Sequence, residues 1–264
     1  MGSAGVRLGG RIAGGAALAG ALLAIGAPVR AADEEIQVYM DEIGPRGAIG
    51  LDVHLNHVLD GDPGADYPGG EPSLHRLRIT PEFSLGLGGG FEAGLYLPLA
   101  TVASDNVFRV QGVKARLKWI APHDEEMGFY WGFNFELGRV AHRLDENPWN
   151  AELKAIGGWR GGKWNLAVNG NLDFKVSGPA PAPATFQLAT KLSYALSPGV
   201  ALGVESYNDF GAFAHFGDFA ANEQATYLTA DTHIGKWDLN LGIGHGYAAS
   251  GDHLVAKMVI GVPL

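Results

Sequence analysis

Three cations at alternate positions of one short stretch are the residues whose type and spacing could do chemistry. The stretch reads VKARLKW (113–119), and in a β-strand Lys114, Arg116 and Lys118 would share one face while the apolar residues between them share the other. A row of cations at a repeat of roughly 7 Å attracts an anionic solute or pairs with carboxylates in a structural network. Either role requires that neighbouring strands form a wall with this face turned toward an enclosed polar space.

Period-two alternation of apolar and polar residues recurs along most of the chain, as in GFYWGFNFELG (128–138) and TFQLATKLSYAL (185–196). Most such runs reach about ten residues, longer than the usual five or six and close to the 9–11 that cross a bilayer. They predict about twelve strands, near 47–58, 74–86, 90–100, 109–120, 127–138, 150–160, 163–175, 184–196, 199–208, 224–234, 236–247 and 253–264.

The connections between these runs alternate between short turns and longer polar loops, as they do in outer-membrane barrels. Aromatic residues on the apolar faces lie beside the short turns, where a lipid–water interface would place them. We expect these residues to be lipid-interface anchors: Trp119, Trp131, Trp159, Trp164, Tyr194 and Trp237. The sequence therefore predicts an all-β fold, a transmembrane antiparallel up-and-down β-barrel of about 12 strands over residues 47–264. A soluble periplasmic β-protein is the alternative.

The N-terminal region has a different character. Arg7 and Arg11 precede a short apolar, Gly-rich run that ends in VRA (29–31), which predicts a secretory signal peptide over residues 1–31. Residues 32–46 are expected to form an N-terminal periplasmic segment. Its acidic part, ADEEIQVYMDEI (32–43), is interpreted as a short periplasmic strand, a partial plug of the barrel or a solvated tail.

Composition excludes several classes of function. The formal net charge is −9, and removal of residues 1–31 would make the chain more acidic, because they contain three arginines and no acid. Nucleic acid is therefore not an expected partner, since binding to phosphates needs a basic surface. The chain has no cysteine, which excludes disulfides and thiolate metal sites. The predicted location is the cell outer membrane.

The polar faces of the predicted strands must point into the barrel, because a charge facing lipid at mid-depth costs about 2–4 kcal/mol. The candidates for the lumen or for solute contact are Arg76, Arg78, Glu82, Lys114, Arg116, Lys118, Asn134, Glu136 and Lys191. Two interpretations of the basic stripe stay open: contact with a solute, or a salt-bridge network that fills a narrow lumen.

Two stretches and the barrel layout carry a family resemblance: EIQVYMDEIGPRGAIGLDVHLNHVLDG (35–61) and HRLRITPEFSLGLGGGFEAGLYLPL (75–99). The chain resembles proteobacterial outer-membrane β-barrels, in particular the putative transporters grouped with the meta-pathway barrels of phenol degradation. This resemblance implies an outer-membrane channel for small, hydrophobic or aromatic compounds. Many such barrels end in Phe or Trp, whereas this chain ends in Leu264.

No enzymatic motif is recognised, so neither catalytic residues nor cofactors are predicted. His245 on an apolar face and His142 in an outer loop have no serine at an obvious strand spacing, and a lipid hydrolase is therefore the weaker interpretation. The nine histidines form no HxH or HxxxH pair, and no metal site is predicted. The Phe-rich segment 208–223 is expected either to fold into the barrel mouth or to pack on its rim.

These observations together predict a passive channel or uptake protein for small solutes, anionic or aromatic and hydrophobic in character. A structural or adhesive barrel with a closed lumen is the alternative, and a lipid-modifying enzyme comes third. The expected partners are outer-membrane lipids, the barrel-assembly machinery and a small-molecule solute.

Overall fold

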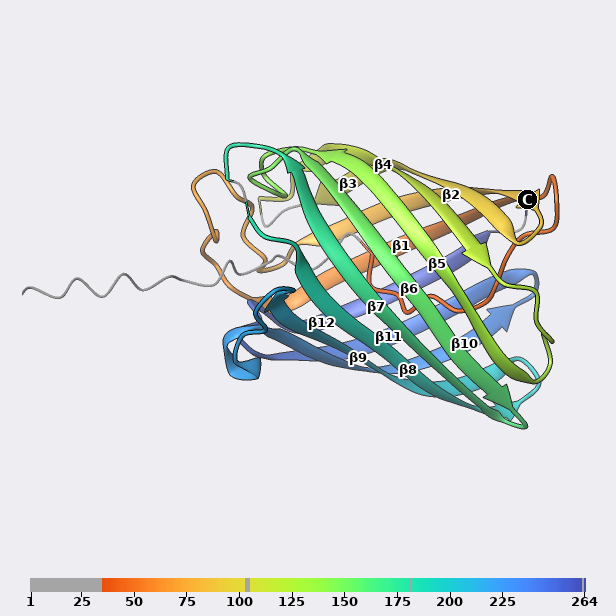
Figure 1. Ribbon diagram of the computed structural model, residues 1–264. Coiled ribbons are helices and arrows are strands. Elements are labelled where there is room, and N and C mark those ends of the chain that lie inside the picture. The colour runs from red at the N-terminus through yellow and green to blue at the C-terminus, as the bar shows by residue number, and fades with distance from the viewer. Residues whose placement is uncertain (1–34, 103–104, 181, 263) are drawn as a thin grey trace, which may run out of the picture.

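The alternating runs form twelve antiparallel strands in a computed structural model, which describes residues 35–102, 105–180, 182–262 and 264 (Figure 1). The predicted signal peptide, residues 1–31, lies outside the described residues. The strands are β1 (Ile49–Gly61), β2 (Leu77–Gly88), β3 (Phe91–Val102), β4 (Phe108–Ile120), β5 (Gly128–Val140), β6 (Trp149–Gly161), β7 (Trp164–Ser177), β8 (Thr185–Ser197), β9 (Val200–Ala212), β10 (Glu223–Ile234), β11 (Trp237–Ala248) and β12 (Asp252–Val262). One short 3₁₀ helix, η1 (Phe219–Ala221), precedes β10.

Each strand pairs with its neighbours in sequence, and β1 pairs with β12 to close the barrel. The closing ladder sets Val53 opposite Ile260 and Leu55 opposite Met258, in the same antiparallel pattern as the other ladders. Closure leaves no unpaired sheet edge, which satisfies the backbone polar groups without water. The predicted all-β barrel of about 12 strands is confirmed.

The two faces of each strand differ as the alternation predicts. In β5 the outward side chains include Phe129, Trp131 and Phe135, which are 80%, 61% and 43% exposed. The inward side chains Asn134 and Glu136 are 0% and 5% exposed. The outside of the barrel is therefore apolar, and the inside carries the charges.

Turn lengths differ between the two ends of the barrel. At one end the two-residue turns 89–90, 162–163, 198–199 and 235–236 join consecutive strands, together with the longer turn 121–127. Gly162 and Gly235 have φ of 59° and 66°, a left-handed conformation that suits glycine in such tight turns. Longer connections gather at the other end, among them the loop between β1 and β2 (Figure 1). We call these the short-turn end and the long-loop end.

The predicted strand boundaries differ from the observed ones mainly at the long-loop end. The alternation predicts that strand β9 ends at residue 208, but the strand continues to Ala212, which lies opposite Thr185 of β8. The Phe-rich loop is correspondingly shorter. Phe210, Phe213 and Phe216 cluster on Phe186 of β8, with ring centroids 5.5–6.2 Å apart. These rings pack on the rim of the barrel, because Phe186 belongs to the apolar face of its strand.

The described residues before β1 belong to no strand; the red-orange segment in Figure 1 runs through the inside of the barrel toward the short-turn end and loops out there before β1. Ile36, Val38 and Tyr39 are 6%, 2% and 3% exposed. We call residues 35–44 the lumen segment. Within the described part of the chain, no helix is both long and apolar enough to cross a membrane.

Candidate functional site: the barrel interior

The basic stripe of β4 faces the interior, and Arg116 lies at the centre of a carboxylate pair. Its Nη2 contacts Oε1 of Glu82 on β2 and lies 2.9 Å from Oε1 of Glu92 on β3. The side chains of Arg116, Glu82 and Glu92 are 4%, 5% and 10% exposed. Because charged side chains with so little exposure to water need partners, this triad is part of the wall's structure.

The other two cations of the stripe have different environments. Lys118 donates from Nζ to the carbonyl oxygen of Glu42 in the lumen segment, at 2.8 Å. Nζ of Lys114 lies 4.0 Å from Oε2 of Glu136, and the Lys114 side chain is 21% exposed. The stripe therefore holds carboxylates and the lumen segment, and Lys114 is its most accessible member.

The remaining candidates from the sequence also face inward, although they lie at different levels of the barrel. Arg76 is 3.3 Å from Asp252, near the long loops. Lys191 lies 3.4 Å from Glu205 and 2.9 Å from Asp231. Asn134 donates to Glu136 at 2.9 Å, and Arg78 is 4% exposed. These residues do not meet in a single binding site, and a role for them in solute contact stays a prediction.

Tyr39 of the lumen segment contacts several residues of the barrel wall. Its amide donates to Oδ1 of Asn169 at 2.6 Å, and Nδ2 of Asn169 donates to its carbonyl oxygen at 2.9 Å. Its hydroxyl lies 2.6 Å from that of Tyr96. Burial, followed by the charges of Glu35 and Glu136, raises the pKa of the Tyr39 phenol well above its usual value, so the ring remains neutral.

Three cations surround the Tyr39 ring. Nζ of Lys154 lies 4.0 Å from the ring centroid, Nζ of Lys118 lies 5.2 Å away, and the Arg116 guanidinium carbon lies 5.8 Å away. Cations over an aromatic face are attracted to its negative quadrupole. The wall therefore binds this ring through both its polar group and its π-face.

Apolar contacts add to this anchoring. Val38 and Tyr39 pack in one buried cluster with inward-facing Ile120, Tyr130 and Ile156. Ile36 packs in a second cluster with residues of β1, β10 and β12, and Lys257 donates to its carbonyl oxygen at 3.0 Å. Inward-facing apolar side chains at these positions are what a plugged lumen requires, since water would otherwise cover them.

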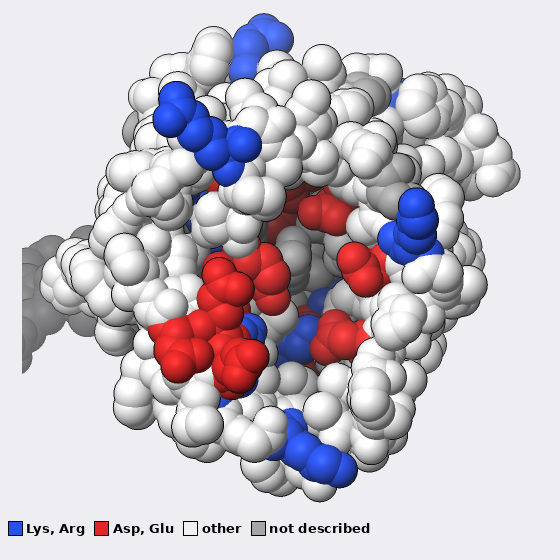
Figure 2. Space-filling view, turned by 90° about the vertical axis from the view of Figure 1, so that its right-hand side faces the viewer, with Lys and Arg blue, Asp and Glu red and all other residues white. Residues whose placement is uncertain are grey.

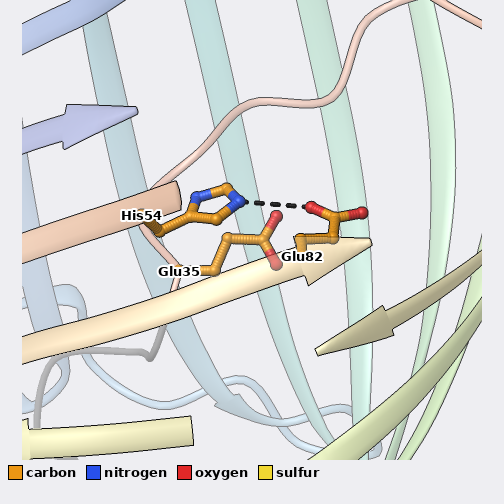
Figure 3. A group of neighbouring side chains, drawn as sticks. All are labelled: Glu35, His54 and Glu82. Atoms are coloured by element: carbon orange, nitrogen blue, oxygen red, sulfur yellow. Dashed lines mark hydrogen bonds and ion pairs between the residues drawn. The ribbon is translucent and has the colours of Figure 1, made fainter. Parts of the chain in front are cut away.

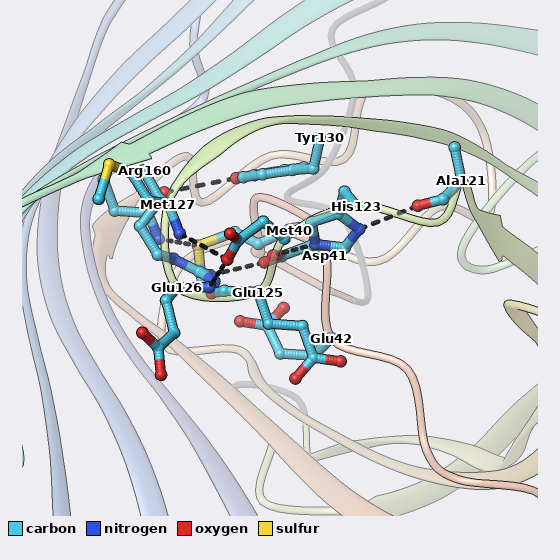
Figure 4. A network of polar contacts seen from close by, with 12 residues as sticks. Met40, Asp41, Glu42, Ala121, His123, Glu125, Glu126, Met127, Tyr130 and Arg160 are labelled. Atoms are coloured by element: carbon cyan, nitrogen blue, oxygen red, sulfur yellow. Dashed lines mark hydrogen bonds and ion pairs between the residues drawn. The ribbon is translucent and has the colours of Figure 1, made fainter.

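At the short-turn end the lumen segment is held by Asp41 (Figure 4). His123 Nε2 lies 2.8 Å from its Oδ2, and Arg160 Nη2 lies 2.6 Å from its Oδ1. Arg160 also donates to the carbonyl oxygen of Glu125 at 2.5 Å, which joins the turn 121–127 to β6. Asp41 is 8% exposed, so this contact is shielded from solvent.

The stabilisation that the His123–Asp41 contact provides is expected to depend on pH. Desolvation lowers the pKa of His123, but hydrogen bonds to the Ala121 carbonyl and to Asp41 outweigh it, so the folded-state pKa is raised above 6.5. A raised pKa gives stability that is complete below pH 6.5 and is lost as the pH rises through the folded-state value. The urea midpoint of the wild type should therefore exceed that of His123→Gln at pH 5.5, and the difference should shrink as the pH rises through the folded-state pKa of His123. A difference that does not change with pH would contradict this assignment.

The lumen between the segment and the wall holds a cavity of about 900 Å³ that opens at the short-turn end (Figure 2). The cavity is lined by nine carboxylates and five cations. The carboxylates are Asp41, Glu42, Asp52, Glu82, Glu92, Glu125, Glu205, Asp231 and Asp238, and the cations are Arg116, Lys118, Arg160, Lys163 and Lys191. A second cavity of about 70 Å³ lies toward the long loops, beside Glu35 and Lys154. The lumen segment separates a wide chamber from a narrow one.

The expected lipid-interface anchors lie on the outside of the barrel. Trp131, Trp159, Trp164 and Trp237 are 61%, 37%, 47% and 46% exposed. Trp119 packs edge-on against Trp131, with ring centroids 5.2 Å apart, and Tyr194 packs on Trp164, with ring centroids 4.7 Å apart. These residues belong to the strand ends that meet the short turns. Their contact with lipid stays a prediction.

The two histidines weighed for a lipid hydrolase have structural contacts. Nδ1 of His245 lies 2.9 Å from the carbonyl oxygen of His253, and its ring lies beside that of Tyr247. Nε2 of His142 lies 3.0 Å from the carbonyl oxygen of Pro68. In the described part of the chain, neither ring is hydrogen-bonded to a carboxylate, as a base acting on serine would be.

A closed barrel of twelve antiparallel strands, apolar outside and charged inside, is the fold of outer-membrane porins and channels. The chain is similar in structure to the KdgM porin, with a TM-score of 0.55 and 12% identity, over 81% of this chain and 99% of that one. It is also similar to an outer-membrane channel from Pseudomonas putida F1, with a TM-score of 0.57 and 16% identity, over 86% and 99% of the two chains.

A third similar structure is the NanC porin, with a TM-score of 0.50 and 11% identity over 80% of this chain and 97% of that one. No protein-family model matches the sequence, and no curated protein matches it. Sequence identities this low show a shared fold only, and they do not identify the solute. A narrower relation to the meta-pathway barrels stays a prediction.

Proposed function

We propose that this protein is an outer-membrane channel for small solutes, exported by a cleaved signal peptide, in which the lumen segment forms the constriction. The observation that carries the proposal is the cavity of about 900 Å³, which is lined by charged side chains and opens at the short-turn end. A structural barrel would be expected to fill this space with side chains. Lipids, the barrel-assembly machinery and a passing solute are the proposed partners, and no catalytic step is involved.

The net charge of the wide chamber predicts which charge of solute it attracts. The basic stripe alone favours anions, but Arg116 and Lys118 are occupied by carboxylates and by the lumen segment. Nine carboxylates against five cations give the chamber a negative potential, which raises the local concentration of cations. We therefore propose a preference for cationic or neutral solutes at this mouth, with the anionic or aromatic solutes expected from the sequence as the competing classes.

Planar-bilayer recordings test both parts of the proposal. Purified protein should give discrete single-channel currents, and a KCl gradient should give a reversal potential on the cation-selective side. Lys114→Gln, which changes the most accessible cation of the stripe, should move the reversal potential further toward cations. Block by benzoate but not by a cationic amine would favour the anionic, aromatic class. No current under any condition would contradict the channel.

The closed structural barrel remains the second candidate, because one specific observation favours it. The lumen segment fills the middle of the barrel and is held there by buried contacts at Ile36, Tyr39 and Asp41. A protein that conducts nothing, even after these contacts are removed, would belong to this class.

A further inference from the structure

Three metal-ligating side chains from separate parts of the chain meet inside the barrel: Glu35 of the lumen segment, His54 of β1 and Glu82 of β2 (Figure 3). One ligand atom from each lies within 4.8 Å of the other two. Nε2 of His54 is 3.2 Å from Oε2 of Glu82, and the carboxylate of Glu35 is directed at the same point. Ligands of a tetrahedral zinc ion lie roughly 3.3 Å apart, so a small movement of Glu35 would complete this arrangement.

The polar atoms of this group are incompletely satisfied by protein. Among the described residues, Oε1 of Glu35 is buried and has no hydrogen-bond partner. His54 is 1% exposed, and its Nδ1 also has no partner among those residues, so the imidazole is oriented by its Nε2 contact with Glu82 and by packing beside the Tyr96 ring. A buried carboxylate oxygen without a donor is costly, and a cation would satisfy it.

The charge balance also fits a divalent ion. Arg116 contacts Oε1 of Glu82 and shares its charge with Glu92, which leaves Oε2 of Glu82 directed at His54. Two carboxylates and a neutral imidazole present two negative charges to an ion at their centre. One nitrogen and two oxygen ligands suit Zn²⁺ and its first-row neighbours better than Mg²⁺ or Ca²⁺, which prefer oxygen ligands alone.

We propose that Glu35, His54 and Glu82 form a site for a divalent transition-metal ion, with Zn²⁺ as the best match, and that the bound ion ties the lumen segment to the β1–β2 wall. Because one ligand comes from the segment and two come from the wall, the metal would stabilise the segment inside the barrel. The site stands on its own geometry and does not require the protein to be a channel.

Calorimetric titration of Zn²⁺ into metal-free, detergent-solubilised barrel tests the proposal. The wild type should show one strong site per chain, and Glu35→Gln should weaken it at least about tenfold, since even the loss of a residue that supports a metal ligand costs that much. His54→Gln should act in the same way, while Mg²⁺ should give no strong site. Glu35→Gln alters no residue of the barrel wall, so its folding, checked by heat-modifiable mobility, is expected to be unchanged.

The matched control is His253→Gln. His253 lies 3.9 Å from both Asp60 and Asp62 near the long-loop end and is the more accessible place for adventitious zinc. Its substitution should leave the strong site intact, and X-ray absorption at the zinc edge should show one nitrogen and two carboxylate ligands from the protein. Strong zinc binding that survives Glu35→Gln, that disappears in His253→Gln, or that is absent from the wild type would overturn the proposal.

Discussion

Arg116→Gln is expected to lower the free energy of unfolding by about 3–5 kcal/mol, the typical cost of removing one partner from a buried ion pair. The cost is large because Glu82 and Glu92 both lose their cation, and their side chains are only 5% and 10% exposed. Urea unfolding in detergent micelles, followed by tryptophan fluorescence, would measure the effect.

The matched control for this prediction is Lys114→Gln, two residues away on the same face. Its ammonium lies 4.0 Å from Glu136 and its side chain is 21% exposed, so its loss should cost about 1 kcal/mol or less. The double variant Arg116→Gln/Glu82→Gln should recover part of the loss, because one unpaired charge is removed. Equal effects of Arg116→Gln and Lys114→Gln would show that the triad is not structural.

Tyr39→Ala should have the second large effect, a several-fold rise in single-channel conductance. The substitution removes a ring in contact with Lys154 and a hydroxyl hydrogen-bonded to Tyr96, and so loosens the lumen segment at the middle of the barrel. It should also destabilise the protein by about 3–5 kcal/mol, as truncation of a buried aromatic residue usually does.

Tyr39→Phe separates the two contributions of this side chain. It keeps the ring beside the three cations and removes only the hydroxyl, so the conductance should stay near that of the wild type. Gln37→Ala is the control within the segment, because Gln37 lines both cavities but belongs to neither anchored cluster, so its truncation removes side-chain volume without loosening the segment. An unchanged conductance in Tyr39→Ala would mean that the segment does not constrict the lumen.

Local alternation was sufficient to predict the wall of the barrel. In β5 exposed and buried side chains alternate from Phe129 to Val140, and strand length and turn length follow from the same pattern. The inward placement of Arg116 and Glu82 follows as well, since the apolar face has to be outside. The alternation did not predict that β9 continues to Ala212. Phenylalanines in this part of the chain pack on the rim, so the sequence resembles a Phe-rich loop there.

The contents of the barrel were harder to predict, because no local rule says which residues fill a lumen. The sequence left open whether 32–43 is a strand, a plug or a tail, and gave Tyr39 and Asn169 no special role. One signal was present: Ile120, Tyr130 and Ile156 are apolar residues on inward positions of three adjacent strands. Such residues need a partner inside the barrel, and the lumen segment is that partner.

The Asp41 contacts and the Glu35–His54–Glu82 group depend on distant parts of the chain. Residue 41 meets residues 123 and 160, and residue 35 meets residues 54 and 82. A search for closely spaced histidines cannot find such a group, because its ligands come from three separate elements. Barrel closure and the path of the lumen segment bring these residues together.

We propose that the lumen segment sets the width of the channel. The most direct test is the single-channel conductance of a variant that lacks residues 35–43 but retains the signal peptide and all twelve strands. The conductance of this variant should be several-fold above that of the wild type, and heat-modifiable mobility should show that the barrel is still folded. A folded deletion variant that conducts no more than the wild type would contradict it.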